Sequence, residues 1–110
     1  MKEKINTELD SMAIILHAGN AKSCAFEAMM EVKQGNVESY NDKYQEARKE
    51  IVLAKKAHAE LLRKLSAAEC MENIDLLLVH AEGHLSSTDI AVELIGDIGE
   101  LYKWKENLYG

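Results

Sequence analysis

Two histidines four residues apart, His80 and His84, stand in an apolar segment that runs from Leu76 to Leu85. Residues three and four apart share one face of an α-helix, so both imidazoles and the intervening Gly83 are predicted to lie on one surface. A neutral imidazole in such a place can hold a metal ion or act as a nucleophile. These are the two kinds of chemistry that the segment makes possible.

The other two histidines, His17 and His58, are expected to be hydrogen-bonded residues of the core. A metal centre at His80 and His84 is the weaker alternative. Two histidines are an incomplete set of metal ligands, and no acidic residues are spaced along the chain so as to complete it. The sequence has no Glu-x-x-His, phosphate-loop or G-x-S-x-G motif, which argues against di-iron, nucleotide and serine hydrolase chemistry. What remains is a histidine nucleophile that accepts a phosphoryl group, and this needs neither metal nor nucleotide.

The composition narrows the class of protein. The 110 residues include 13 basic and 19 acidic side chains, a formal charge of −6, which argues against nucleic acid or an anionic membrane as a partner. No run approaches the roughly 18 apolar residues of a membrane span, and the two isolated cysteines, Cys24 and Cys70, are expected to be free thiols. We therefore expect a cytoplasmic protein of one domain, small enough that oligomerisation is expected too.

The elements that must position the histidines are predicted to be helices, since the chain lacks proline and is rich in strong helix formers. Breaks near Gly35 and between Cys70 and Asn73 divide it into helices over about 7–33, 37–69 and 72–108. The predicted fold is all-α, an antiparallel up-down-up three-helix bundle forming a single domain over 1–110. The first helix carries small residues at core spacing: Ala18, Ala21, Ala25, Ala28 and Val32.

The second helix has one apolar seam, which includes a single histidine: Val37, Tyr40, Tyr44, Ala47, Ile51, Ala54, His58, Leu61, Leu65 and Ala68. Its opposite face is charged, and we expect it to be a solvated surface.

The third helix has two stripes rather than one. The first is Ile74, Leu78, Ala81, Leu85, Thr88, Val92, Ile95, Gly99 and Tyr102. The second, nearly opposite, is Leu76, His80, Gly83, Ser87, Ile90, Leu94, Asp97, Leu101, Trp104 and Leu108. Because one bundle can cover only one stripe, the second predicts an interface between subunits, with His80 in a cleft left by the small residues Gly83 and Ser87.

Several segments, read together, resemble the lactose/cellobiose-type enzyme IIA family of the bacterial sugar phosphotransferase system. They are Ala18-Gly19-Asn20-Ala21-Lys22-Ser23 with Glu27-Ala28, Gly35-Asn36-Val37, Ala57-His58, and the segment Leu76 to Leu85. The resemblance implies a homotrimer of three-helix subunits, a nine-helix bundle. It implies a phosphocarrier rather than a free-standing enzyme, which accepts a phosphoryl group from the phosphocarrier protein HPr and passes it to a cysteine of the cognate IIB component. The membrane IIC component then takes up a β-linked disaccharide such as cellobiose, lactose or chitobiose.

By the same resemblance, His80 is the phosphoryl acceptor, with its tele nitrogen (Nε2) the candidate atom, His84 has a supporting role and His58 lines the site. The chain departs from the family pattern at Gly83, where the family has an aspartate associated with a divalent metal on the trimer axis, so no metal and no other cofactor is expected. It also departs at Leu61 and Leu62, where the family has Gln and Thr, and at Ser86 and Ser87, where it has Met and Thr. Glu82 replaces the family's glutamine and adds a negative charge two residues from His80. These departures leave open an alternative, a diverged helical trimer with a regulatory or scaffolding role and no phosphoryl transfer.

Overall fold

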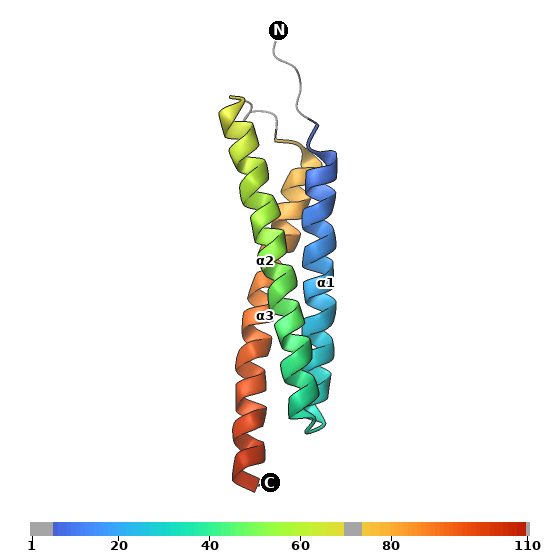
Figure 1. Cartoon of the computed structure of the whole chain (residues 1–110), viewed down its shortest axis with the longest axis vertical. Helices are drawn as coiled ribbons and strands as arrows, with labels where there is room; N and C mark the ends of the chain where they lie inside the picture. Colours follow the sequence, from blue (N-terminus) through green and yellow to red (C-terminus); the bar gives the residue numbers. More distant parts are fainter. Residues whose placement is uncertain (1–5, 70–73, 110) are drawn as a thin grey trace.

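The computed structural model describes residues 6–69 and 74–109 of the chain. These residues form helices α1 (Glu8–Lys33), α2 (Val37–Ala67) and α3 (Leu76–Tyr109). The helices pack side by side into a rod about 68 Å long, with α1 and α3 running in one direction and α2 in the other (Figure 1). The predicted all-α, up-down-up three-helix fold is therefore confirmed for the described residues.

A Schellman motif closes α1 and turns the chain into α2. The amide of Gly35 donates to the carbonyl of Val32 at 3.1 Å, and the amide of Asn36 donates to the carbonyl of Glu31 at 2.9 Å. Gly35 has φ +85°, a backbone conformation that costs glycine little and other residues more. The short turn brings α1 and α2 directly alongside each other.

The core lies along the small residues of α1, which are fully buried: Ala18, Ala21, Ala25, Ala28 and Val32. Alanines let the neighbouring helices approach closely, and larger residues of α2 and α3 fill the space around them. The predicted seam of α2 is confirmed, with Ile51, Leu61 and Leu65 buried and His58 half-buried.

Tyrosines join α2 to α3 in the half of the bundle that holds the α1–α2 turn. The rings of Tyr40 and Tyr44 stack with centroids 5.5 Å apart, and the hydroxyl of Tyr44 donates to the carbonyl of Val92 at 2.9 Å. Gly96 and Gly99 face these rings, and a Cβ on either glycine would overlap a tyrosine hydroxyl. The two glycines therefore let α3 approach the tyrosines closely.

The start of α3 lies at Leu76, four residues later than expected, and α2 ends at Ala67 rather than at residue 69. Asp75 explains the start of α3. Its carboxylate accepts hydrogen bonds from the amide of Leu78 at 2.9 Å and from the hydroxyl of Thr7 at 3.3 Å, so Asp75 caps α3 and ties it to α1. The expected break between Cys70 and Asn73 lies outside the described residues.

Candidate functional site

The two stripes of α3 have opposite surroundings in the structure. The inner stripe is buried from Leu78 to Gly99, and its first member, Ile74, precedes the helix and is partly exposed. Every member of the outer stripe is exposed: Leu76, His80, Gly83, Ser87, Ile90, Leu94, Asp97, Leu101, Trp104 and Leu108. The chain thus leaves uncovered the apolar stripe that carries His80.

His80 lies on this outer stripe with its side chain exposed, and no hydrogen bond joins its ring to another described residue. The space beside it is open. A Cβ added to Gly83 would meet no atom within 4 Å, and the Ser87 hydroxyl turns back to donate to the carbonyl of His84 at 3.2 Å. A neutral ring nitrogen of His80 is accordingly accessible to a reacting group from outside the chain.

His84 lies on the flank of α3 that faces α1. Its side chain is half-buried, and its Nε2 is 4.0 Å from the position that a Cβ on Gly19 would take. The imidazole of His84 therefore lies near the backbone of α1 at Gly19, with space enough for a Cβ at that position. We did not predict this contact from the sequence, although Gly19 belongs to one of the segments that carry the family resemblance.

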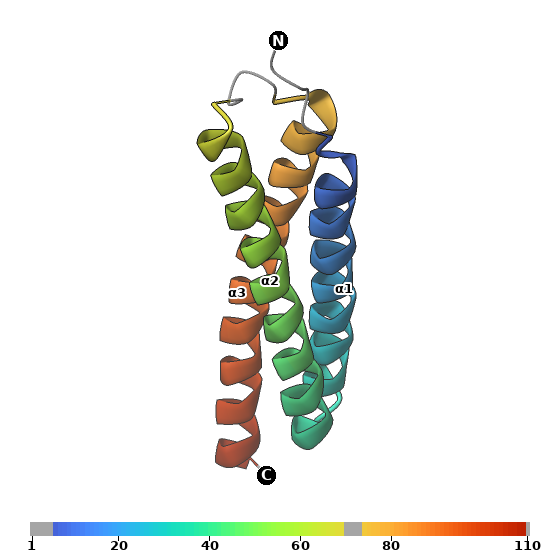
Figure 2. The ribbon, with the colours of Figure 1, turned by 45° about the horizontal axis from the view of Figure 1, so that its top comes forward.

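α1 adds apolar side chains to the same surface. Residues three, four and seven positions from Gly19 lie on its side of α1 and include Leu16, Met12 and Phe26, all exposed. α1 and α3 run in the same direction along the bundle (Figure 2), so these side chains and the outer stripe of α3 can contribute to one surface. We call this surface the α1–α3 face.

His58 belongs to α2 and lies against the flank of α3 opposite to the one that carries His84. Its Nε2 is 2.7 Å from Oε2 of Glu82, and because a carboxylate accepts only, Nε2 holds the proton of this bond. Both side chains are half-buried between α2 and α3. The structure therefore brings His58 to Glu82 and not to the exposed side of α3 where His80 lies.

The sequence did not predict the pairing of His58 with Glu82, because Glu82 was considered only as a charge near His80. The spacing of acidic residues was a signal in the sequence. Glu82 and Asp89 are seven residues apart and so share one side of α3, and in the structure Asp89 pairs with Lys55 of α2 at 3.0 Å. Glutamine, the family's residue, could also accept a hydrogen bond from His58. The carboxylate of Glu82 is thus engaged in the contact between α2 and α3.

His17 joins α1 to α2, with its Nδ1 2.7 Å from Oε2 of Glu50. The expected hydrogen bond is confirmed, but the side chain is half-buried at the seam between the helices rather than enclosed in the core.

Cys24 is a free thiol and half-buried. Burial raises its pKa, with a smaller contribution from Glu27, Glu46 and Glu50, so the thiol stays protonated and weakly nucleophilic. Cys70 lies outside the described residues.

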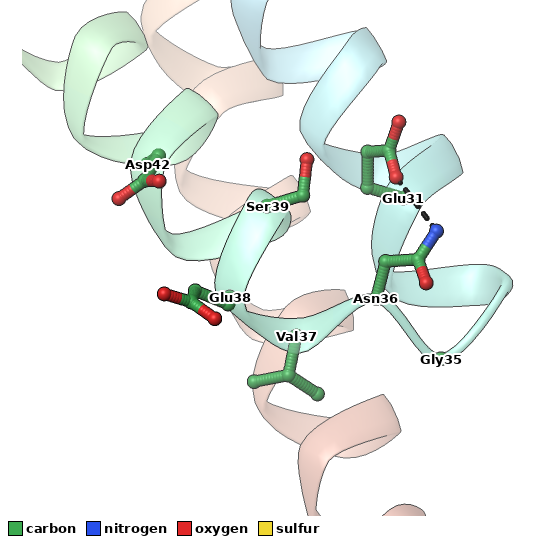
Figure 3. Close-up of a pocket in the computed structure, with 7 residues that line it drawn as sticks. All are labelled: Glu31, Gly35, Asn36, Val37, Glu38, Ser39 and Asp42. Carbon is green, nitrogen blue, oxygen red and sulfur yellow. Dashed lines mark hydrogen bonds between the residues drawn. The ribbon is translucent and has the colours of Figure 1, made fainter.

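A hollow of about 620 Å³ lies at the α1–α2 turn (Figure 3), at the opposite end of the bundle from His80. Its polar lining is carboxylates and small polar groups, including a hydrogen bond of 2.9 Å from Asn36 to Glu31. Its lining includes the hydroxyl of Ser39 but no histidine. Among residues 6–69 and 74–109, moreover, no three histidine, cysteine or acidic side chains are grouped to hold a metal ion.

Fold and surface together define a class of protein: a long three-helix bundle that exposes a histidine on an apolar stripe. Residues 10–103 match the family described as PTS system, Lactose/Cellobiose specific IIA subunit. The chain belongs to this family of the phosphoenolpyruvate-dependent sugar phosphotransferase system (PTS), which confirms the resemblance seen in the sequence. In addition, none of the described helices combines the length and apolarity that a membrane crossing requires.

Individual relatives and solved structures that resemble this chain are also named as IIA components. The oligo-β-mannoside-specific EIIA component of Bacillus subtilis is 33% identical over 101 residues, covering 92% of this chain and 91% of the relative. The crystal structure of the cellobiose-specific enzyme IIA from Bacillus anthracis superposes with a TM-score of 0.84 at 30% identity, covering 96% and 95% of the two chains. The IIA(Chitobiose)–HPr complex of Escherichia coli gives a TM-score of 0.79 at 28% identity, covering 94% and 99%.

Proposed function

We propose that this IIA component carries a phosphoryl group on His80, accepting it from HPr and passing it to a cysteine of a cognate IIB component. The observation that carries the proposal is the exposure of His80. It is the one exposed histidine of the four, all of which lie in the described part of the chain, while His17 and His58 are each bound to a carboxylate. The IIA(Chitobiose)–HPr complex supports HPr as the donor, because it is a complex of a structural neighbour.

The chemistry needs one accessible ring nitrogen. Its lone pair attacks phosphorus, a P–N bond forms on His80, and the P–N bond to the histidine of HPr breaks and leaves its electron pair on that nitrogen. In the second transfer the thiolate of IIB forms a P–S bond as the P–N bond of His80 breaks. His84, four residues further on α3, is the supporting residue, whereas His58 acts through the α2–α3 contact and not on the phosphoryl group.

The α1–α3 face supports assembly as a homotrimer. It exposes large apolar side chains such as Leu16, Leu94 and Trp104, and burial against other copies would remove them from water. A divalent metal on the trimer axis does not fit this chain, because Gly83 has no side chain to supply a ligand atom. We therefore propose a trimer without that metal or any other cofactor.

The transported sugar is proposed to be a β-linked disaccharide such as cellobiose, lactose or chitobiose. Relatives named for lichenan, galactose, cellobiose and N,N'-diacetylchitobiose have similar identities to this chain, 30–35%, so similarity alone does not choose among them. We also propose that the protein acts in the cytoplasm, where HPr and IIB would meet it.

Incubation with phosphorylated HPr tests the proposal. We expect one acid-labile phosphoryl group per subunit, and we expect His80→Ala to abolish labelling. His17→Gln is the matched control and should label normally, because it removes a histidine that points to α2 and is bound to Glu50 there. Labelling that survives in His80→Ala would refute the assignment.

The alternative is a diverged trimer that regulates or scaffolds without carrying phosphate. The observation in its favour is the set of departures from the family, yet Leu61 is fully buried and Glu82 is bound to His58, so both serve packing between helices. An intact trimer that no HPr donor can label would favour this alternative.

A further inference from the structure

Two lines of residues on the α1–α3 face each contain one charged side chain, and the two charges have opposite sign. Residues seven apart lie in one line along a helix. On α3 such a line is apolar or small except at one carboxylate, and all its members are exposed: Gly83, Ile90, Asp97 and Trp104. On α1 a line of the same spacing ends at an exposed lysine: Met12, Gly19, Phe26 and Lys33. Each line thus interrupts an apolar surface with a single charge.

Both of these charges lack an ion-pair partner in the part of the chain that the structure describes. The neighbouring carboxylates of α3 differ from Asp97, since Glu93 pairs with Arg48 at 3.4 Å and Glu100 with Lys103 at 3.5 Å. On α1, Lys33 differs in the same way from the acidic Glu27, which pairs with Lys43. Asp97 and Lys33 are therefore available to groups outside their own chain.

Contacts at both ends of the bundle fix the relative height of α1 and α3, which run in the same direction (Figure 2). Near the start of both helices, the hydroxyl of Thr7 donates to the carboxylate of Asp75, 68 positions later, at 3.3 Å. Near the end of α1, the carboxylate of Glu106, 71 positions after Gly35, lies 3.4 Å from the position that a Cβ on Gly35 would take. A residue of α1 is accordingly level with the residue of α3 about 68–71 positions later.

This offset places the two unpaired charges near one height. Lys33 is level with about residues 101–104 of α3, which is about one to two helical turns beyond Asp97. Side chains lean toward the N-terminus of their own helix, so the long side chain of Lys33 leans toward the level of Asp97. Height therefore allows the two groups to meet, although the structure does not pair them within one chain.

We propose that Lys33 of one copy of the chain pairs with Asp97 of the next copy, once at each boundary of the homotrimer. The pairing rests on the proposed trimer and names the charged residues that join its copies. A three-fold axis along the rod turns a copy without changing its height, so Lys33 and Asp97 stay near one level when they belong to different copies. Each pair joins two different surfaces, and three such pairs close the ring.

An antiparallel pair of copies satisfies the same charges less well. Lys33 and Asp97 both lie in the half of the rod that holds the α1–α2 turn, so two antiparallel copies joined through them would overlap only there. The exposed apolar side chains of the other half, such as Met12 and Leu16, would then remain in water. A parallel ring covers both halves.

Other cations of the chain fit Asp97 less well than Lys33 does. α3 has no lysine or arginine from residue 76 to residue 102, Lys103 pairs with Glu100, and Lys105 lies over the ring of Tyr102 at 5.9 Å. Lys22, the other cation of α1, is level with about residues 90–93 of α3 and leans away from Asp97. Lys22 is therefore the matched control for Lys33.

Exchange of the two charges tests the pair, with the trimer dissociation constant measured by light scattering over a dilution series. We expect Asp97→Lys and Lys33→Asp, each alone, to raise the dissociation constant at least about tenfold, because like charges then face each other at every boundary. The double variant, Lys33→Asp with Asp97→Lys, restores the pair in reverse and should return within about threefold of the unmodified chain.

The control and the overturning results follow from the same series. Lys22→Asp with Asp97→Lys has the same net charge as the double variant and should not restore the trimer. A trimer that the double variant fails to restore, with helix content unchanged by circular dichroism, would overturn the pair and leave the proposed trimer standing. An unmodified chain that is monomeric would overturn both.

Carbodiimide cross-linking supplies a second measurement that needs no variant. It joins a lysine directly to a carboxylate in contact with it, and a mixture of isotope-labelled and unlabelled chains separates links between copies from links within one copy. We expect mass spectrometry to find Lys33 linked to Asp97 of a differently labelled chain. A Lys33–Asp97 link found only within single chains, or Lys33 linked only to other carboxylates, would overturn the proposal.

Discussion

Gly83 and Gly99 of α3 differ in what a side chain would meet. A Cβ on Gly99 would overlap the hydroxyl and Cζ of Tyr40, which is only 2% exposed and has no room to move, whereas a Cβ on Gly83 would meet open space. We expect Gly99→Ala to lower the free energy of unfolding by about 1–3 kcal/mol through overpacking. Gly83→Ala, its control, should raise it by up to about 1 kcal/mol. Urea denaturation measures both, and equal effects would contradict the packing at Tyr40.

Tyr40 also predicts a loss of stability at high pH. Burial, with the nearby Tyr44, Glu100 and Asp97, raises the pKa of Tyr40 from 10.0 to about 12. Below pH 10 both folded and unfolded chains keep the proton, and between pH 10 and 12 only the unfolded chain releases it. Stability should therefore fall across this range, by about 2–3 kcal/mol from this group.

Tyr40→Phe isolates the contribution, because phenylalanine keeps the stacked ring and cannot ionise. Denaturation at pH 9 and pH 11.5 should show a smaller loss for Tyr40→Phe than for the unmodified chain. The same loss in both proteins would show that other groups are responsible.

The sequence supported some residue-level conclusions better than others, for a physical reason. The exposure of His80 could be predicted from helical periodicity, because periodicity fixes which residues share a side of one helix. The contacts of His58 with Glu82 and of His84 with Gly19 depend on how far one helix slides and turns against the next. The periodicity of one helix says nothing about its position and rotation relative to the next helix.

The beginning of α3 depends on one capping residue. The carboxylate of Asp75 accepts from the amide of Leu78 at 2.9 Å, and it also accepts from the hydroxyl of Thr7. We expect Asp75→Ala to lower the free energy of unfolding by about 1–2 kcal/mol and Asp75→Asn by less, since asparagine caps nearly as well. Thermal denaturation by circular dichroism would detect the order, and equal losses for Ala and Asn would contradict the cap.

Helix boundaries were harder to predict than helices. The turn at Gly35 was located because glycine marks it directly, and α1 and α2 end and begin beside it as expected. For α3, the sequence offered only the break between Cys70 and Asn73, and the start expected from it at residue 72 was four residues too early. Only the hydrogen bonds of Asp75 in the folded chain distinguish the true beginning.

At the scale of the whole molecule, the exposed apolar side chains of the α1–α3 face are the basis of the proposed trimer. Exposed residues such as Leu94 at 57% continue the outer stripe along most of α3, and Leu16 at 60% belongs to α1. The sequence could predict that the outer stripe of α3 is left uncovered by its own chain, since one helix had two apolar stripes. It could not predict the contribution of α1, which becomes visible only when the two helices are placed side by side.

This surface yields a prediction for the assembly. Leu94→Lys should convert the proposed trimer to monomers while the helix content stays constant, because three buried leucines lose about 2 kcal/mol each and three charges gather at the interface. Light scattering coupled to gel filtration measures the mass. Val52→Lys, with nearly the same exposure at 51% but on α2, is the control and should remain trimeric.

Removal of divalent metal tests the same assembly. Addition of EDTA should leave the trimer intact, since Gly83 offers no ligand atom. A trimer that dissociates in EDTA would show that a metal holds it together through other residues.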